Sequence, residues 1–244
     1  MSVPFVPGPW STLRLLSACG VVLVLSACGS GGDSSTMVVV NLASAPGDAA
    51  MAAYVQAAHQ VMLSAKDSMN NHYTFQLDQV PGSSTTTFNG MANVYSLTDT
   101  VTLSQNGTVI GNSADTSYAL LNPVMPLGKV NSTGIPYALV TSSTPIPGTL
   151  TAGSTGSFDN QTYYHDSTQT VIDALESSTF TVTASSPTYL LYCIQSVISG
   201  TTAQGTADGM GDSAETDCYA VTAAGVATVK SVSITVAGGT LKFE

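Results

Sequence analysis

Charged residues are scarce in this chain, and basic residues are the scarcest. Charged side chains make up 8% of the 244 residues, with 5 lysines and arginines against 15 aspartates and glutamates, and the formal net charge is −10. Phosphate backbones and anionic lipid surfaces repel so acidic a chain, which argues against nucleic acid as a partner. The hydrophobic fraction of 43% is too high for a disordered protein. Serine, threonine, alanine and glycine replace the missing charge, as is common in β-rich proteins outside the cytoplasm.

The motifs of common enzymes and cofactor sites are also missing. The sequence contains no G-x-S-x-G, no H-E-x-x-H, no phosphate-binding loop and no dinucleotide fingerprint. We therefore predict no catalytic residue and no cofactor. His165 stands beside Asp166, but adjacent residues on a strand point to opposite faces, so we do not expect them to pair. A hydrolase would require His165 or His72 to meet a serine and a carboxylate in a cleft.

The apolar run near the N-terminus is too short to cross a bilayer, which takes about 20 apolar residues. It follows Arg14 and ends at Leu25-Ser26-Ala27-Cys28-Gly29. Small residues before a cysteine, behind a short hydrophobic region, resemble the lipobox of bacterial lipoprotein precursors. That resemblance implies that residues 1–27 are a signal peptide and that Cys28 is the lipid-attachment residue. By the same resemblance, the glycine after the cysteine implies sorting to the outer membrane. We therefore expect a protein that is anchored in that membrane and faces the periplasm or the outside.

Two alternatives to this interpretation stay open at the sequence level. A second copy, Leu16-Ser17-Ala18-Cys19-Gly20, precedes the first, but almost no hydrophobic region lies before it. The segment could also be an ordinary secretion signal followed by an incidental cysteine. On the lipoprotein interpretation, residues 28–40 are the acylated cysteine and a flexible tether, because glycine and serine linkers behave as coils. Residues 41–244 then form a single β-rich domain.

The body contains an even pair of cysteines, Cys193 and Cys218. In an oxidising compartment such a pair predicts a structural disulfide. Their spacing is not C-x-x-C, which argues against a redox-active pair. Two thiols alone do not form a zinc site.

One helix is expected near the start of the body. Asp48 can cap it, and residues 49–69 are mostly good helix formers. An apolar stripe recurs at spacings of three and four, which predicts a helix packed on a sheet. The residues of this stripe are Met51, Val55, Ala58, Met62, Ala65 and Met69. Asn70-Asn71 can end the helix, since asparagine tolerates the left-handed conformation.

Alternating apolar and polar residues after this point predict antiparallel strands with one buried face. The clearest alternating segments are 73–77, 101–103, 180–184 and 232–236. Asn106-Gly107 predicts a tight hairpin turn, and Gly238-Gly239 predicts a final hairpin that returns Leu241 and Phe243 to the apolar face. Residues 189–198 are apolar at both parities, so we expect a central strand covered on both sides.

Prolines and glycines interrupt residues 122–156, which we expect to form loops or sheet edges. The predicted fold class is therefore mainly β: an antiparallel sheet or half-barrel, with one N-terminal helix packed on it.

Acidic residues gather at 208–217, and Gly209 and Gly211 among them allow tight turns. Asp208, Asp212, Glu215 and Asp217 form a weak candidate Ca²⁺ site. Their spacing does not match the EF-hand loop. An acidic hairpin tip tied at its base by the disulfide is the ordinary alternative.

The second half of the body has features of a known group of proteins. Tyr163-Tyr164, the motif Cys218-Tyr219-Ala220-Val221 and the last hairpin resemble β-rich proteobacterial lipoproteins of unknown function. The helix-on-sheet arrangement is also similar to the half-barrel of periplasmic lipoprotein carriers, a likeness of architecture alone. We predict a non-enzymatic envelope protein that is either structural or interacts with other envelope components. The alternative is a module that encloses a lipid or another apolar ligand.

Overall fold

The computed structural model describes residues 41–236 and 239–244, so Cys28 and the predicted signal and tether lie outside the described residues. Most of the described chain forms one antiparallel sheet of 13 strands. From edge to edge, its main path runs through β2 (His59–Lys66), β3 (His72–Pro81), β5 (Met91–Gln105), β6 (Thr108–Leu121), β7 (Val124–Asn131), β8 (Tyr137–Ser143), β10 (Thr155–Tyr164), β11 (Ile172–Thr183), β12 (Tyr189–Ser199), β13 (Ser213–Thr222), β14 (Ala227–Val236) and β15 (Gly239–Phe243). The short strand β4 (Thr86–Phe88) pairs with β5, and β1 (Ser44–Pro46) pairs with β9 (Thr149–Thr151).

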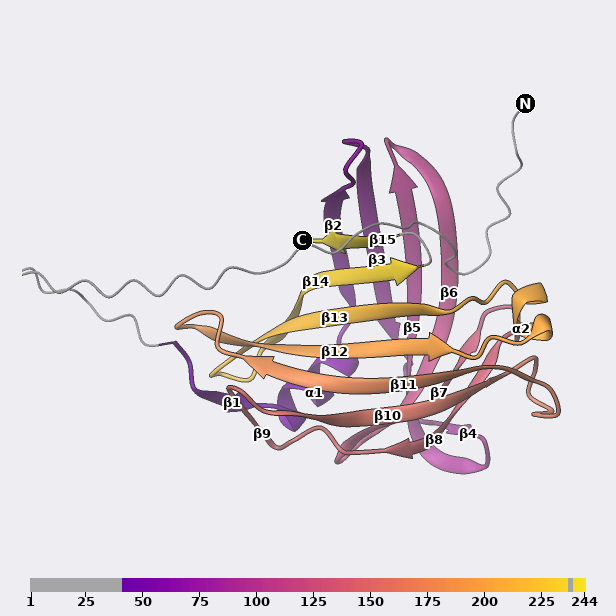
Figure 1. The fold of residues 1–244 in the computed structure, drawn as a ribbon. Coiled ribbons are helices and arrows are strands. Elements are labelled where there is room, and N and C mark those ends of the chain that lie inside the picture. The colour runs from indigo at the N-terminus through magenta and orange to yellow at the C-terminus, as the bar shows by residue number, and fades with distance from the viewer. Residues whose placement is uncertain (1–40, 237–238) are drawn as a thin grey trace, which may run out of the picture.

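The sheet curls until its two edge strands meet. In Figure 1, β2, β3, β5 and β6 stand across the direction of β10 to β14. At the seam between the edges, Ser64 on β2 and Glu244 after β15 exchange backbone hydrogen bonds of 3.2 and 3.0 Å. The predicted fold class, a mainly β chain with an antiparallel sheet and one packed N-terminal helix, is confirmed.

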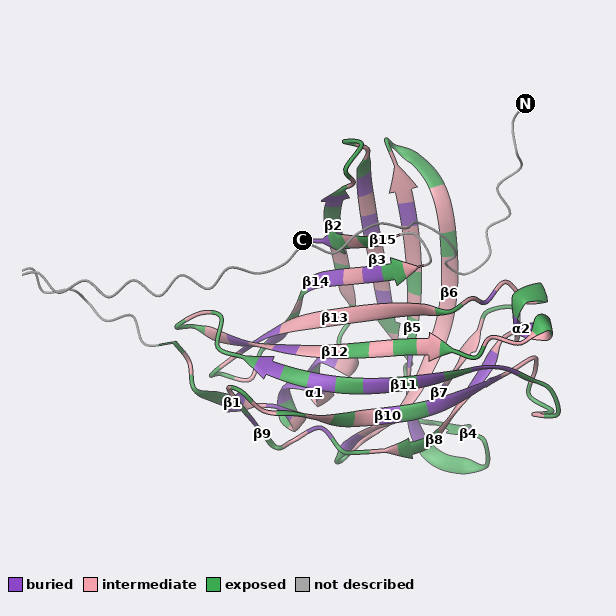
Figure 2. Cartoon of the chain, in the orientation of Figure 1, coloured by how far each residue is buried: buried purple, intermediate pink, exposed green. Residues whose placement is uncertain are grey.

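The face of the sheet toward the inside of the curl, here called the interior face, carries two apolar clusters. In the first, Met51 and Tyr54 of α1 (Asp48–Val55) pack with Leu190 and Val221. In the second, Phe243 and Val232 close the seam against residues of β2 and β3. Figure 2 shows the resulting alternation of buried and exposed residues along β11.

The expected long helix is wrong beyond Val55. The chain leaves α1 and enters β2, which pairs with β3 from His59 to Lys66. In β2, Leu63 is buried whereas Met62 is 70% exposed, a strand alternation and not a helical stripe. Pairing along a whole strand outweighs the small differences in helix propensity. Asn70 does adopt a left-handed conformation, with φ 63°, but in the turn between β2 and β3.

The strand and hairpin predictions are largely confirmed. Asn106 and Gly107 have φ of 49° and 82°, as the predicted tight turn between β5 and β6 requires. At the other end of the chain, Phe243 is fully buried, and Leu241 packs against the same cluster. The turn before them includes residues 237–238, which lie outside the described part of the chain.

The expectation of loops or edges over residues 122–156 is wrong in part, because β7 and β8 lie well inside the sheet. Pro126 sits within β7 opposite Ala119, directly beside a register shift. A bulge at this point lets the strand accommodate a residue that cannot donate to the ladder.

The strand β12 is central, as predicted, but only one of its faces is well covered. Leu190 and Tyr192 on the interior face are fully buried, while Val197 on the other face is 38% exposed. Cys193 lies opposite Cys218 of β13, and the predicted disulfide between them is confirmed.

Candidate metal centre

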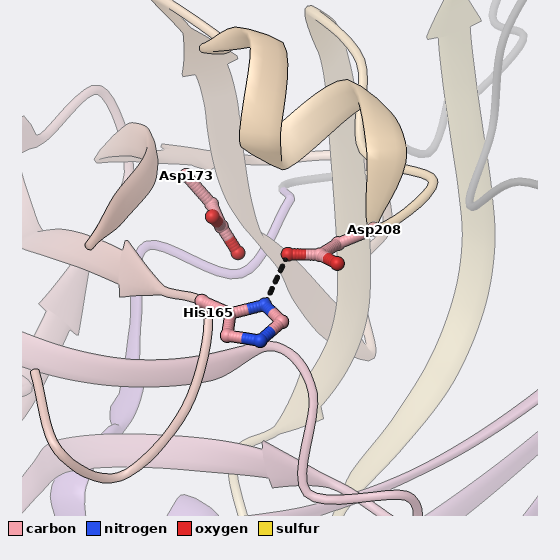
Figure 3. Close-up of side chains that lie close together, drawn as sticks. All are labelled: His165, Asp173 and Asp208. Atoms are coloured by element: carbon pink, nitrogen blue, oxygen red, sulfur yellow. Dashed lines mark hydrogen bonds and ion pairs between the residues drawn. The ribbon is translucent and has the colours of Figure 1, made fainter.

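A histidine and an aspartate from distant parts of the sequence meet at one end of the sheet. His165 directly follows β10, and its backbone N–H donates to the carbonyl oxygen of Val171 to close the turn before β11. Asp208 directly follows the short helix α2 (Ala203–Ala207). The Nδ1 atom of His165 lies 2.7 Å from Oδ2 of Asp208 (Figure 3).

A second aspartate, Asp173 near the start of β11, points toward this pair (Figure 3). Its side chain is fully buried, and neither of its carboxylate oxygens has a hydrogen-bond partner in the protein. One ligand atom each from His165, Asp173 and Asp208 lies within 4.8 Å of the other two. We call these residues the His165 group.

Local packing brings α2 close to Asp173. The hydroxyl of Thr202 accepts from the N–H of Gly205 and caps the helix, while the N–H of Thr202 donates to the carbonyl oxygen of Asp173 at 2.8 Å. A Cβ atom on Gly205 would collide with that same carbonyl oxygen, so the approach requires glycine. The helix therefore holds Asp208 in a fixed position relative to Asp173.

Asp208 is oriented from two sides, by His165 and by Gln204. The Nε2 atom of Gln204 donates to both carboxylate oxygens of Asp208, at 3.1 Å each. Burial alone would raise the pKa of Asp208, but its hydrogen bonds to His165 and Gln204 lower it overall. The hydrogen bond between His165 and Asp208 raises the pKa of His165.

The pKa of Asp173 shifts in the opposite direction to that of Asp208. Burial raises its pKa, and the charge of Asp208 raises it further, to about 6. The group thus combines an imidazole, an ionised carboxylate and a buried carboxyl group without a partner. Imidazole and carboxylate are ligands that Zn²⁺ and similar divalent ions accept, and three protein ligands leave further positions for water.

The structure separates the four carboxylates of the candidate Ca²⁺ site. Asp208 belongs to the His165 group, whereas Asp212 accepts hydrogen bonds from Thr201. Glu215 and Asp217 lie on β13, where their pairing with Ile234 and Val232 places them on the interior face. The predicted loop ends at Asp212, because β13 begins at the next residue.

The histidines are also placed by the fold. Asp166 bonds to Thr168 and does not hydrogen-bond to His165, but both residues lie in the turn after β10 and not on a strand, so the expected alternation of faces is not the reason. His59 stacks on Tyr54, with ring centroids 4.0 Å apart. Within the described residues, no serine hydrogen-bonds to a histidine side chain. Sequence reasoning missed Asp173 and its meeting with His165, since no local pattern signals a contact made across the sheet.

Neither helix of the described chain has the length and apolarity needed to cross a membrane. Comparisons with protein families, with curated proteins and with solved structures find no match to this chain.

Proposed function

We propose that this protein is a lipid-anchored envelope protein whose body binds a divalent transition-metal ion at the His165 group, in a non-enzymatic role. The observation that carries the metal-binding part is Asp173, a fully buried carboxyl group without a hydrogen-bond partner in the protein. Burying a carboxylate is unfavourable unless a cation or a donor compensates it. A cation between Asp173, Asp208 and His165 supplies that compensation to both carboxylates at once.

The chemistry of the three residues favours an ion of the Zn²⁺ class over Ca²⁺. Calcium takes six to eight oxygen ligands, whereas imidazole nitrogen suits zinc and its neighbours. Gln204 orients Asp208 through its amide. Such an oriented carboxylate is typical of the groups that support a metal ligand.

The two alternatives from the sequence have less support. The buried residues of α1 pack against Leu190 and Val221 in a continuous apolar cluster, and the pocket that Val55 lines at the end of this helix has polar residues such as Gln56 and Ser96 in its wall. A hydrolase requires a serine beside the histidine, and the side chains within hydrogen-bond distance of the His165 ring among the described residues are Asp208 and Gln204.

Metal binding is tested on the full chain by titration with Zn²⁺ in a calorimeter, with the bound metal counted by elemental analysis. We expect one ion per chain, and a loss of affinity greater than about 100-fold in Asp173→Asn and His165→Ala, which remove ligands. Asp166→Asn is the matched control, because it removes a neighbouring carboxylate that belongs to no metal-ligating group. Absence of Zn²⁺ binding, or equal losses in all three variants, contradicts the proposal.

The anchor is tested separately by labelling cells with palmitate. The lipobox at Cys28 supports incorporation of label that Cys28→Ser abolishes and Cys19→Ser leaves unchanged. Label that persists in Cys28→Ser contradicts attachment at this cysteine. Fractionation of the labelled membranes then checks the outer-membrane address.

A further inference from the structure

Two hollows lie along the same two segments of the chain, the connection from α1 to β2 and the end of β3. The first has a volume of about 400 Å³, within the range of small-molecule sites, and the second has a volume of about 200 Å³. The first is lined by Ala58, His59, Gln60, Asp78, Gln79 and Val80. The second continues both walls, with Gln56 on one side and Pro81 on the other. The two hollows therefore form one groove, here called the α1–β3 groove.

Both walls of the α1–β3 groove are held by hydrogen bonds within the protein. After α1, the N–H of Ala57 donates to the carbonyl oxygen of Tyr54 at 3.1 Å, and Nε2 of His59 lies 3.0 Å from the same oxygen. After β3, the N–H of Gly82 donates to the carbonyl oxygen of Ser96 at 2.9 Å. A Cβ atom on Gly82 would collide with the hydroxyl of Ser96, so this wall packs closely on β5. A groove with fixed walls is preorganised, and little free energy is lost in ordering it around a ligand.

The side chains that line the groove are polar and mostly uncharged. Asp78 adds a carboxylate to the first hollow, and its Oδ1 atom has no hydrogen-bond partner in the protein. Among the described residues, no lysine or arginine lines either hollow. Exposed amide and hydroxyl groups, which both donate and accept hydrogen bonds, are supplied by Gln56, Gln60, Ser83 and Ser84.

This chemistry disfavours an anionic ligand and favours a neutral one with many hydroxyl groups. A phosphate, sulfate or carboxylate would meet Asp78 with no cation in the lining of the described groove, in a chain whose formal net charge is −10. Hydroxyl groups of a ligand donate to carboxylate and amide oxygens and accept from amide N–H groups. They therefore match both kinds of polar group in this lining.

Two further features favour a sugar over a peptide. The ring of Tyr95 is half-buried in the wall of the second hollow and offers an apolar face, on which the C–H face of a sugar ring can pack. Strand β3 is paired with β2 and with β5 along the first hollow as far as Gln79. It therefore has no free edge there to which an extended peptide could add as a further strand.

We propose that the α1–β3 groove binds a neutral glycan of two or more sugar units. One sugar ring occupies the first hollow, where its hydroxyl groups bond to Asp78 and Gln60, and the next ring packs on Tyr95 in the second. The site shares no residue with the His165 group. It requires neither the metal ion nor the lipid anchor.

The proposal is tested by calorimetric titration of the full chain with neutral hexasaccharides, namely cellohexaose, maltohexaose and chitohexaose. A hexamer of galacturonic acid is the anionic comparison, and a hexapeptide of alternating serine and valine is the peptide comparison. We expect at least one neutral hexasaccharide to bind, and the anionic hexamer to bind at least about tenfold more weakly. The binding is expected to persist in Asp173→Asn, which removes a ligand of the proposed metal centre.

Two variants and a matched control locate the binding. Tyr95→Ala removes the aromatic face and Gln60→Ala removes an amide that bonds to the ligand, so we expect the affinity to fall by about tenfold and about threefold, respectively. Gln195→Ala is the control and should leave the affinity unchanged, because Gln195 is an exposed glutamine of β12 that lines neither hollow.

Circular dichroism shows whether each variant folds, and the exposed Gln60 keeps the test decisive if Tyr95→Ala does not fold. The proposal is overturned if no neutral hexasaccharide binds, or if the anionic hexamer or the peptide binds more tightly. Equal losses of affinity in Gln60→Ala and Gln195→Ala also overturn it, since they would place the ligand outside the groove.

Discussion

Replacing Asp99 with asparagine is expected to stabilise the protein at neutral and higher pH. Asp99 lies on the interior face of β5, where Gln79 donates to its Oδ1 atom at 2.8 Å. Burial raises the pKa of Asp99 to about 6, with a further contribution from the charge of Asp115, although the bond from Gln79 opposes the change. Asparagine keeps an acceptor for Gln79 and carries no charge.

The magnitude follows from the pKa difference between the folded and unfolded chain. Each pKa unit corresponds to about 1.4 kcal/mol. A rise from 3.8 to about 6 therefore makes the ionised carboxylate cost roughly 3 kcal/mol in the folded state. Because folding raises the pKa of Asp99, the wild type has its full stability below the pKa of the unfolded chain. It loses roughly 3 kcal/mol of unfolding free energy as the pH rises through about 6. We expect Asp99→Asn to match the wild type near pH 4 and to exceed it by up to about 3 kcal/mol near pH 8.

Urea unfolding at both pH values measures this difference, with the disulfide kept oxidised. The comparison between variant and wild type isolates Asp99, because Glu215, Asp217 and Glu176 titrate in both proteins. A variant that is less stable than the wild type near pH 8, or whose advantage does not shrink on acidification, refutes the reasoning.

The remaining predictions concern packing and covalent structure. Gly205→Ala forces α2 away from the carbonyl oxygen of Asp173, so we expect a loss of about 1–3 kcal/mol in unfolding free energy and weaker Zn²⁺ binding, measured by denaturation and calorimetry. Cys193→Ala removes the disulfide and should lower stability by roughly 3 kcal/mol, since the bridge closes a loop with a sequence separation of 25. Leu63→Ala should cost about 2–4 kcal/mol, whereas Met62→Ala should stay within about 0.5 kcal/mol, and equal effects would contradict the strand alternation of β2.

Local patterns predicted the parts of the fold that depend on neighbours in the chain. Asn106-Gly107 requires only its own backbone conformation to turn a hairpin, and alternation along residues 232–236 reflects one buried face. Residues 59–66 were misassigned because their apolar positions fit a helix and a strand equally well. Pairing with β3 decided between them, and that partner is not visible in the segment itself.

The candidate site was even less accessible to such reasoning. Asp208 was singled out for its acidic neighbours in sequence, but its contacts are His165 and Gln204. Asp173 gave no signal, because a single aspartate between apolar residues is ordinary at the start of a strand. The meeting of these residues depends on how the β10–β11 and β12–β13 connections come to the same end of the sheet, which is a property of the whole topology.

The order of the strands also bears on how the protein folds. Since almost every strand pairs with its successor in the chain, the sheet can grow hairpin by hairpin as the polypeptide emerges. The junction of Ser64 with Glu244 is different, because it joins the two edge strands of the sheet from opposite ends of the described chain. That junction must form last, and until it does the side chains of Phe75 and Phe243 remain open to aggregation or to assistance by a chaperone.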